Sequence, residues 1–247
     1  MIPEPCRREA VEANVSPVNR ILTVGALTVA LSLASLSACS TDAGTADKPA
    51  SSSAPARTLA TLKQALLAEK DLPSGYTVEA KADDNGATPV ARSKDPKCQS
   101  FVRLINAEAL PGSKASALTA FSGGPDGPFV EEWLEAMGGA AAVEKVQAEI
   151  KASVDECHEV TVSLPGAGAA DMSLTAVEPP AVGAGPVAYQ LAAGSGALDG
   201  FEITFVHTRV GDTLLTMDFV SIDPEAIPAL MGSAHDKAAR VLKISVG

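Results

Sequence analysis

The chain has 247 residues, a formal net charge of −11 at neutral pH and only 4% aromatic residues. This length is sufficient for one domain with a substantial core and further terminal segments. The acidic excess excludes nucleic-acid binding by the usual electrostatic route, and it makes attraction to an anionic membrane surface unfavourable.

The N-terminal region has the residue order of a secretion signal. Arg20 precedes an uncharged apolar stretch over 21–35, and small residues followed by Cys39 come next. The stretch also approaches the length of a membrane-spanning helix, so a retained anchor is the alternative. Asp42 and Asp47 come soon after it, whereas a retained helix is normally flanked by basic residues. We therefore expect cleavage and export.

Residues 36–39, Leu-Ser-Ala-Cys, resemble the lipobox of bacterial lipoproteins. The resemblance implies removal of residues 1–38 and attachment of a diacylglyceryl group to the Cys39 thiol. Two or more acyl chains give stable anchoring, so the membrane is the expected partner, through the N-terminal lipid. The region before the apolar stretch is long and acidic for such a signal, which makes Val15 or Val18 an alternative translation start.

Residues 39–57 form a polar segment without Leu, Ile, Val or Phe. Such a composition cannot contribute to a core, so we predict a disordered linker. The expected organisation is a signal peptide over 1–38, the lipidated Cys39 with its linker over 39–57, and a single domain over 58–247.

Two of the four cysteines remain for the domain, because Cys6 leaves with the signal and Cys39 is lipidated. Cys98 and Cys157 form an even pair in an exported protein, so we predict a disulfide between them. A metal or redox site is the alternative, and it is disfavoured because the sequence has no C-x-x-C motif.

The first half of the domain is predicted to contain helices and short strands. Leucines at helical spacing from Leu59 predict a helix ending before Pro73, and Asp95-Pro96 is a favourable helix start. The other elements expected in this half are a strand over 76–80, a polar loop over 82–91 and a strand over 116–122.

Residues 129–137 fit two structures. Their apolar residues have helical spacing, but the segment could equally pair as a strand after the glycine-rich turn at 123–127. The next segment is clearer, because apolar residues from Val143 to Cys157 recur at intervals of three and four. This spacing predicts an amphipathic helix over 139–157.

The second half is predicted to be rich in consecutive strands. Phe201, Ile203 and Phe205 alternate with polar residues, as in a half-buried strand, and Gly211-Asp212 suits a hairpin turn. Strands are expected over 159–164, 172–177, 187–192, 201–209 and 213–221, with a closing helix from Asp223-Pro224 to Leu242. Helices before and after a run of strands predict an α+β fold, an antiparallel sheet with helices packed on one face.

Four segments carry a family resemblance: Leu66-Leu67, Asp71-Leu72-Pro73-Ser74-Gly75-Tyr76, Asp95-Pro96-Lys97-Cys98, and the Ala-rich helix ending at Cys157. Together they resemble the extracytoplasmic sensor domain of actinobacterial receptor-type Ser/Thr kinases and the lipoproteins that carry this domain. The resemblance implies a binding or sensing module that signals through a partner, since no kinase signature is present. Some members have two disulfides, whereas this chain can form only one.

Three residues of the strand expected over 201–209 are candidates for ligand binding. Phe205, His207 and Arg209 share one face of this strand. A histidine and an arginine at the rim of an apolar face could contact an anionic head group. The alternative is that the inward face ends at the sheet edge, where both side chains reach water.

Two further polar clusters have less specific spacing. His158 lies among three acidic residues at a predicted helix end, where the side chains point in different directions and solvation is expected rather than metal binding. Glu131, Glu132 and Glu135 surround Trp133, and we expect a solvated charged face around one buried tryptophan.

No cofactor, metal or catalytic motif is satisfied. Residues 183–188 match G-x-G-x-x-A, but they precede a strand where the dinucleotide motif requires a helix, so we expect a turn. Ser195 lacks the outer glycines of G-x-S-x-G. We therefore expect a non-catalytic ligand-binding or sensor module. A carrier of a lipid or other hydrophobic molecule is the alternative, a hydrolase is the third hypothesis, and the expected ligand or partner is a small molecule, a lipid or an envelope protein.

Overall fold

The computed structural model describes residues 57–79, 89–164 and 166–244. The predicted signal peptide, Cys39 and residues 40–56 of the predicted linker therefore lie outside the described residues. Within the described ranges, no helix has the length and apolar character needed to cross a membrane. Arg57 already contacts the domain, because its Nε donates to Asp212 Oδ1 at 2.9 Å and its Nη1 donates to the carbonyl of Leu242.

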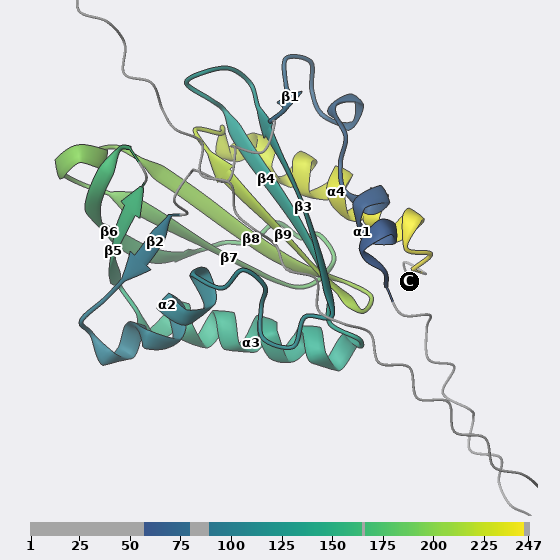
Figure 1. Cartoon of the computed structure of the whole chain (residues 1–247), viewed down its shortest axis with the longest axis horizontal. Coiled ribbons are helices and arrows are strands. Elements are labelled where there is room, and N and C mark those ends of the chain that lie inside the picture. Colours follow the sequence, from purple (N-terminus) through teal and green to yellow (C-terminus); the bar gives the residue numbers. More distant parts are fainter. Residues whose placement is uncertain (1–56, 80–88, 165, 245–247) are drawn as a thin grey trace, which may run out of the picture. The chain divides into compact units, whose positions relative to one another are not determined.

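Among the described residues, nine antiparallel strands form one sheet in the order β1-β3-β4-β9-β8-β7-β6-β5-β2 (Figure 1). Most neighbours in the sheet are also neighbours in the chain, as hairpins require. The strands are β1 Thr77–Val78, β2 Val90–Arg92, β3 Ala115–Ser122, β4 Phe129–Ala136, β5 Glu159–Leu164, β6 Gly168–Val177, β7 Ala184–Ala193, β8 Glu202–Val210 and β9 Thr213–Val220. Gly211 turns the chain between the last two strands with a positive φ of 63°, which a glycine adopts without strain.

The described part of the chain also contains four α-helices and four short 3₁₀ turns. Asp95 and Asp223 each begin a helical segment, since their side chains accept from the backbone N–H two residues later, as expected of N-caps followed by proline. The α-helices are α1 Leu59–Ala65, α2 Gln99–Ile105, α3 Ala140–Glu156 and α4 Ile227–Val241, and the turns are η1 Glu69–Asp71, η2 Pro96–Cys98, η3 Gly196–Leu198 and η4 Pro224–Ala226.

The helices divide between the two faces of the sheet (Figure 1). The closed face is the one that α1 and α4 cover, and the open face is the one on which α2 and α3 lie. The α+β class and the antiparallel sheet are confirmed, but packing of helices on one face only is wrong. The central strands are apolar on both sides: Val206 packs on the closed face and its neighbour Phe205 on the open face, so each face requires cover.

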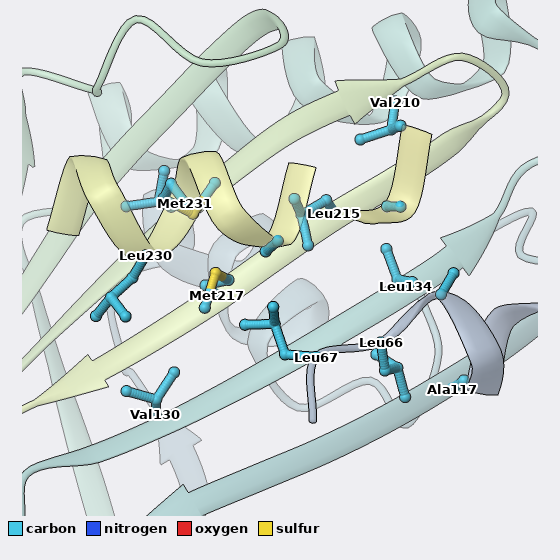
Figure 2. Packing of buried hydrophobic residues seen from close by; sticks show 14 of the residues in the cluster. Leu66, Leu67, Ala117, Val130, Leu134, Val210, Leu215, Met217, Leu230 and Met231 are labelled. Carbon is cyan, nitrogen blue, oxygen red and sulfur yellow. The ribbon is translucent and has the colours of Figure 1, made fainter. Parts of the chain in front are cut away.

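The closed face is a continuous apolar core (Figure 2). Leu215 and Met217 of β9 lie beneath Leu230 and Met231 of α4, and Leu134 of β4 lies near the segment that follows α1. Leu134, Leu215, Met217 and Met231 have no measurable exposure, so their burial contributes about 1.5–3 kcal/mol each before the loss of chain entropy. This face fixes the positions of β4 and β9.

The open face is secured by α3 and the predicted disulfide. Val143, Val146 and Ile150 of α3 are buried against the sheet, in agreement with the spacing expected over 139–157. Cys98 in η2 and Cys157 at the end of α3 are bonded, with an S–S distance of 2.04 Å. The bond links the chain before α2 to the end of α3, so it joins the two helices that lie on this face.

Residues 129–137 are a strand for nearly all of their length. β4 pairs with β3 on one side and with β9 on the other over its whole length. This pairing resolves the ambiguity between helix and strand in favour of the strand, because a hairpin with β3 satisfies its backbone groups on one edge and β9 satisfies the other.

The first helix is confirmed, because α1 ends at Ala65, before Pro73, and is followed by the extended Leu66. Leu67 donates its N–H to the buried carboxylate of Glu132 at 2.6 Å, so the helix does not continue. One other local expectation is wrong. Part of the loop expected over 82–91 is strand β2, whose Ala91 is buried and whose residues pair with β5.

Candidate functional site

A cleft remains on the open face where α2 and α3 do not cover the sheet. Its volume is about 970 Å³, which is large enough for a drug-sized ligand. Much of its wall is apolar and comes from β8 and its neighbours, including Phe201, Ile203 and Phe205. The same three residues formed the apolar face expected from the sequence.

A smaller recess of about 120 Å³ adjoins this cleft and reaches toward α3. Trp133 of β4, Phe205 of β8 and Asp218 of β9 border both spaces. Polar side chains border both spaces: His207 and Glu135 border the recess, and Glu131 borders the cleft. The apolar wall of the cleft therefore adjoins polar groups near Trp133.

Two carboxylates lie side by side where the cleft meets the recess. Glu131 of β4 and Asp218 of β9 are direct cross-strand partners. Burial raises the pKa of Asp218 well above its usual value, and the charge of Glu131 adds to this effect. Burial also raises the pKa of Glu131, opposed by a hydrogen bond from the Trp133 side chain. Asp218 Oδ1 is inaccessible and has no hydrogen-bond partner among the described residues.

His207 is a buried, neutral histidine within the recess. Its Nδ1 lies 2.8 Å from the hydroxyl of Thr216, and only 5% of the residue is exposed. Burial lowers the pKa of His207 to about 4. Tyr189 lies in a stack with Phe205 and His207, with ring centroids 4.9 and 5.5 Å away. Within the described part of the chain, Nε2 of His207 has no hydrogen-bond partner.

The end of the recess is fixed by Glu135. Its carboxylate accepts the backbone N–H of Leu110 at 2.8 Å, which holds the segment between α2 and β3 against the sheet. Burial raises the pKa of Glu135, while this hydrogen bond opposes the increase. The same segment contributes Glu108 to the edge of both spaces.

The structure brings together two of the three predicted ligand-binding residues. Phe205 and His207 border the recess, whereas Arg209 is absent from both described linings and lies 3.4 Å from Glu144 in an ion pair. The expected anionic ligand does not fit this arrangement, because His207 is uncharged at neutral pH and the arginine is engaged elsewhere. His207 is also buried within the sheet and does not lie at a solvated rim.

The acidic cluster around Trp133 is not the solvated face expected from the sequence. Because β4 is a strand, Glu132 points into the closed face with no exposure, while Glu135 on the open face is only 4% exposed. Trp133 is half-buried and borders the cleft. His158, in contrast, is exposed as expected, and the described residues contain no group of three potential metal ligands.

The arrangement offers little for nucleophilic catalysis. His207 contacts the hydroxyl of Thr216, but among the described residues no acid orients the histidine through Nε2, as a nucleophile–base pair requires. Ser195 is exposed beside η3. Residues 184–188 of the glycine-rich segment belong to β7, so the expected turn is largely strand. The register of this part of β7 with β8 is irregular.

Asp218 and Trp133 are the site residues that sequence reasoning missed. The strand expected over 213–221 has apolar residues at alternating positions, and Asp218 is the charged residue on its other face. That single acid was the available signal. Its pairing with Glu131 depends on the contact between β4 and β9, which no local pattern reveals.

Comparison with solved structures supports the fold. The extracellular domain of PknH from Mycobacterium tuberculosis is similar over 76% of this chain and 99% of that domain, with a TM-score of 0.50 and 15% identity. An uncharacterised Rv0999 ortholog from Mycobacterium smegmatis matches 74% of this chain and 98% of its own, with a TM-score of 0.41 and 13% identity. No family model and no curated protein matches the sequence. The likeness to the PknH domain concerns the fold alone.

Proposed function

We propose that this protein is an extracytoplasmic lipoprotein whose domain binds a small amphiphilic molecule without transforming it. The observation that carries the proposal is the cleft of about 970 Å³ on the open face, whose apolar wall adjoins polar side chains. Pockets of this size and composition are typical ligand sites. The fold, which is similar to that of the extracellular domain of PknH, supports a sensor-type role in which a partner receives the signal.

A carrier of hydrophobic molecules is the second candidate. It is favoured by one observation, the lining of the cleft by Phe201, Ile203 and Phe205. A sensor and a carrier share the binding step and differ in the fate of the bound molecule. A sensor transmits occupancy to an envelope protein, whereas a carrier releases its ligand into another membrane or protein.

Anchoring through Cys39 is part of the proposal and has its own test. The Leu-Ser-Ala-Cys sequence supports it, and the disulfide between Cys98 and Cys157 fits an oxidising compartment. We expect Cys39→Ala to leave the precursor uncleaved and without acyl mass in mass spectrometry of the membrane fraction. Normal processing of this variant would contradict lipid anchoring.

Binding in the cleft is tested with the neutral apolar dye N-phenyl-1-naphthylamine, excited directly. The full-length protein should increase the dye's fluorescence, and Ile203→Trp, which fills the apolar wall, should reduce the increase severalfold. Ala176→Trp is the matched control, because Ala176 is exposed on β6 and lies outside the lining. Equal fluorescence from all three proteins would contradict the proposed site.

A further inference from the structure

The cleft has an unbalanced charge. Five acidic residues border the cleft or its recess, and none of the described lining residues is a lysine or an arginine. The five are Glu79, Glu108, Glu131, Glu135 and Asp218. Some acidic residues elsewhere in the domain have basic partners, such as Asp71, whose carboxylate lies 2.6 Å from Nζ of Lys237.

The paired acids at the junction are unfavourable in an empty site. Like charges directly opposite each other on neighbouring strands destabilise a sheet, and Glu131 and Asp218 occupy such positions. Removal from water adds a further cost for each ionised group. A positively charged group between them would offset both costs.

The recess also contains buried acceptors without donors. Asp218 Oδ1 has no donor among the described residues. His207, which is only 5% exposed, has no partner for Nε2 in the same part of the chain. When Nδ1–H donates to Thr216, Nε2 is an acceptor. A group bearing several N–H donors would satisfy both atoms.

We infer that the cleft selects an amphiphile whose head group is a protonated amine. The ammonium lies in the recess between Asp218 and His207, and the apolar chain extends along Phe201 and Ile203. Trp133 and Tyr189 provide aromatic surfaces at the junction, which favour a cation over a neutral group. This inference rests on the proposed function, because it specifies the ligand of the same cleft.

The test compares three probes with the same eight-carbon chain: octylammonium, octanol and octanoate. Trp133 is the only tryptophan of the sequence, so its fluorescence reports directly on the junction. We expect octylammonium to bind about tenfold more tightly than octanol, as one charge-assisted hydrogen bond provides, and octanoate to bind most weakly.

Asp218→Asn should abolish this tenfold preference, so that octylammonium and octanol bind the variant about equally. The variant cannot ionise at this position and keeps its shape, and a thermal melt checks that it folds. Glu178→Gln is the matched control, because it makes the same charge change at an exposed residue outside both linings.

The possible outcomes distinguish the amine selectivity from the proposed binding of an amphiphile in the cleft. Equal binding of the three probes, or tightest binding of octanoate, would overturn the amine selectivity and leave the apolar cleft standing. Preference for the amine that survives Asp218→Asn would likewise overturn the assignment of the recess. Failure of all three probes to bind would overturn both proposals.

Discussion

The two faces of the sheet use the same strands for different purposes. On the closed face, Leu134 of β4 and Met217 of β9 are fully buried beneath α1 and α4. On the open face, the alternate residues Trp133 and Asp218 border a cleft, because α2 and α3 cover only part of the sheet. The difference shows that the placement of helices, more than the strands, decides where this fold leaves space.

The buried acids Glu132 and Asp218 also differ between the closed and open faces. Glu132 on the closed face is unexposed, but its carboxylate accepts the N–H of Leu67 and helps position the segment after α1. Each acid has one buried oxygen without a partner among the described residues, Oε1 of Glu132 and Oδ1 of Asp218. The difference is their location: Glu132 lies in the filled closed face, whereas Asp218 borders the cleft and its recess, where a ligand can reach it.

The largest expected effect concerns the disulfide, which secures the less tightly packed open face. Replacing Cys98 and Cys157 together by alanine should lower the free energy of unfolding by about 4 kcal/mol, because the bond closes a long loop in the unfolded chain. Urea denaturation of the oxidised protein and the double variant measures the difference. An unchanged unfolding midpoint would show that the open face needs no covalent support.

The next effect compares side chains of the two faces directly. Leu134→Ala should destabilise the protein by about 3 kcal/mol, because it leaves a cavity in a filled core. Ile203→Ala should cost only about 1 kcal/mol, since Ile203 borders a cleft that is already open. Urea unfolding of both variants provides the comparison, and equal losses would mean that the cleft is closed in solution.

A smaller effect is the pH dependence of the free energy of unfolding that Glu132 causes. Burial raises the pKa of this carboxyl to about 7, so the folded state binds its proton more tightly than the unfolded chain does. Its contribution is present at acidic pH and declines as the pH rises from about 4.5 through about 7. Between about pH 5 and pH 8 this amounts to about 2 kcal/mol.

Glu132→Gln removes that titration. The stability of the variant relative to the native protein should therefore increase with pH, although Asp71 and Lys237 also lie near this carboxyl and modify its charge. Denaturation curves at several pH values measure the change, with Glu178→Gln as the exposed control. A difference that does not vary with pH would contradict the buried position of Glu132.

Much of the fold could be predicted from local patterns. The spacing of Val143, Val146 and Ile150 indicated α3, and the alternation from Phe201 to Phe205 indicated which side of β8 is buried. The even pair of cysteines left in an exported domain indicated the disulfide. These features depend on residue spacing within short segments or on the number of cysteines, so they can be predicted from the sequence alone.

The cleft could not be predicted in the same way. Residues 129–136 have acids on both faces of β4, so the pattern alone does not indicate that Glu132 is structural and Glu131 borders a cleft. That distinction requires the pairing of β4 with β9 and the position of α1. Long-range contacts of this kind arise from the whole fold, which also explains why Arg209 was expected at the site and pairs with Glu144 instead.

Methionine methyl NMR offers the most direct test that the open face binds ligands and the closed face does not. Met172 borders the cleft, whereas Met217 and Met231 lie in the closed core. Titration of the full-length, methyl-labelled protein with octylammonium should shift the Met172 resonance and leave Met217 and Met231 unchanged. Shifts confined to Met217 and Met231, or no shift at any methionine under saturating probe, would contradict a binding cleft on the open face.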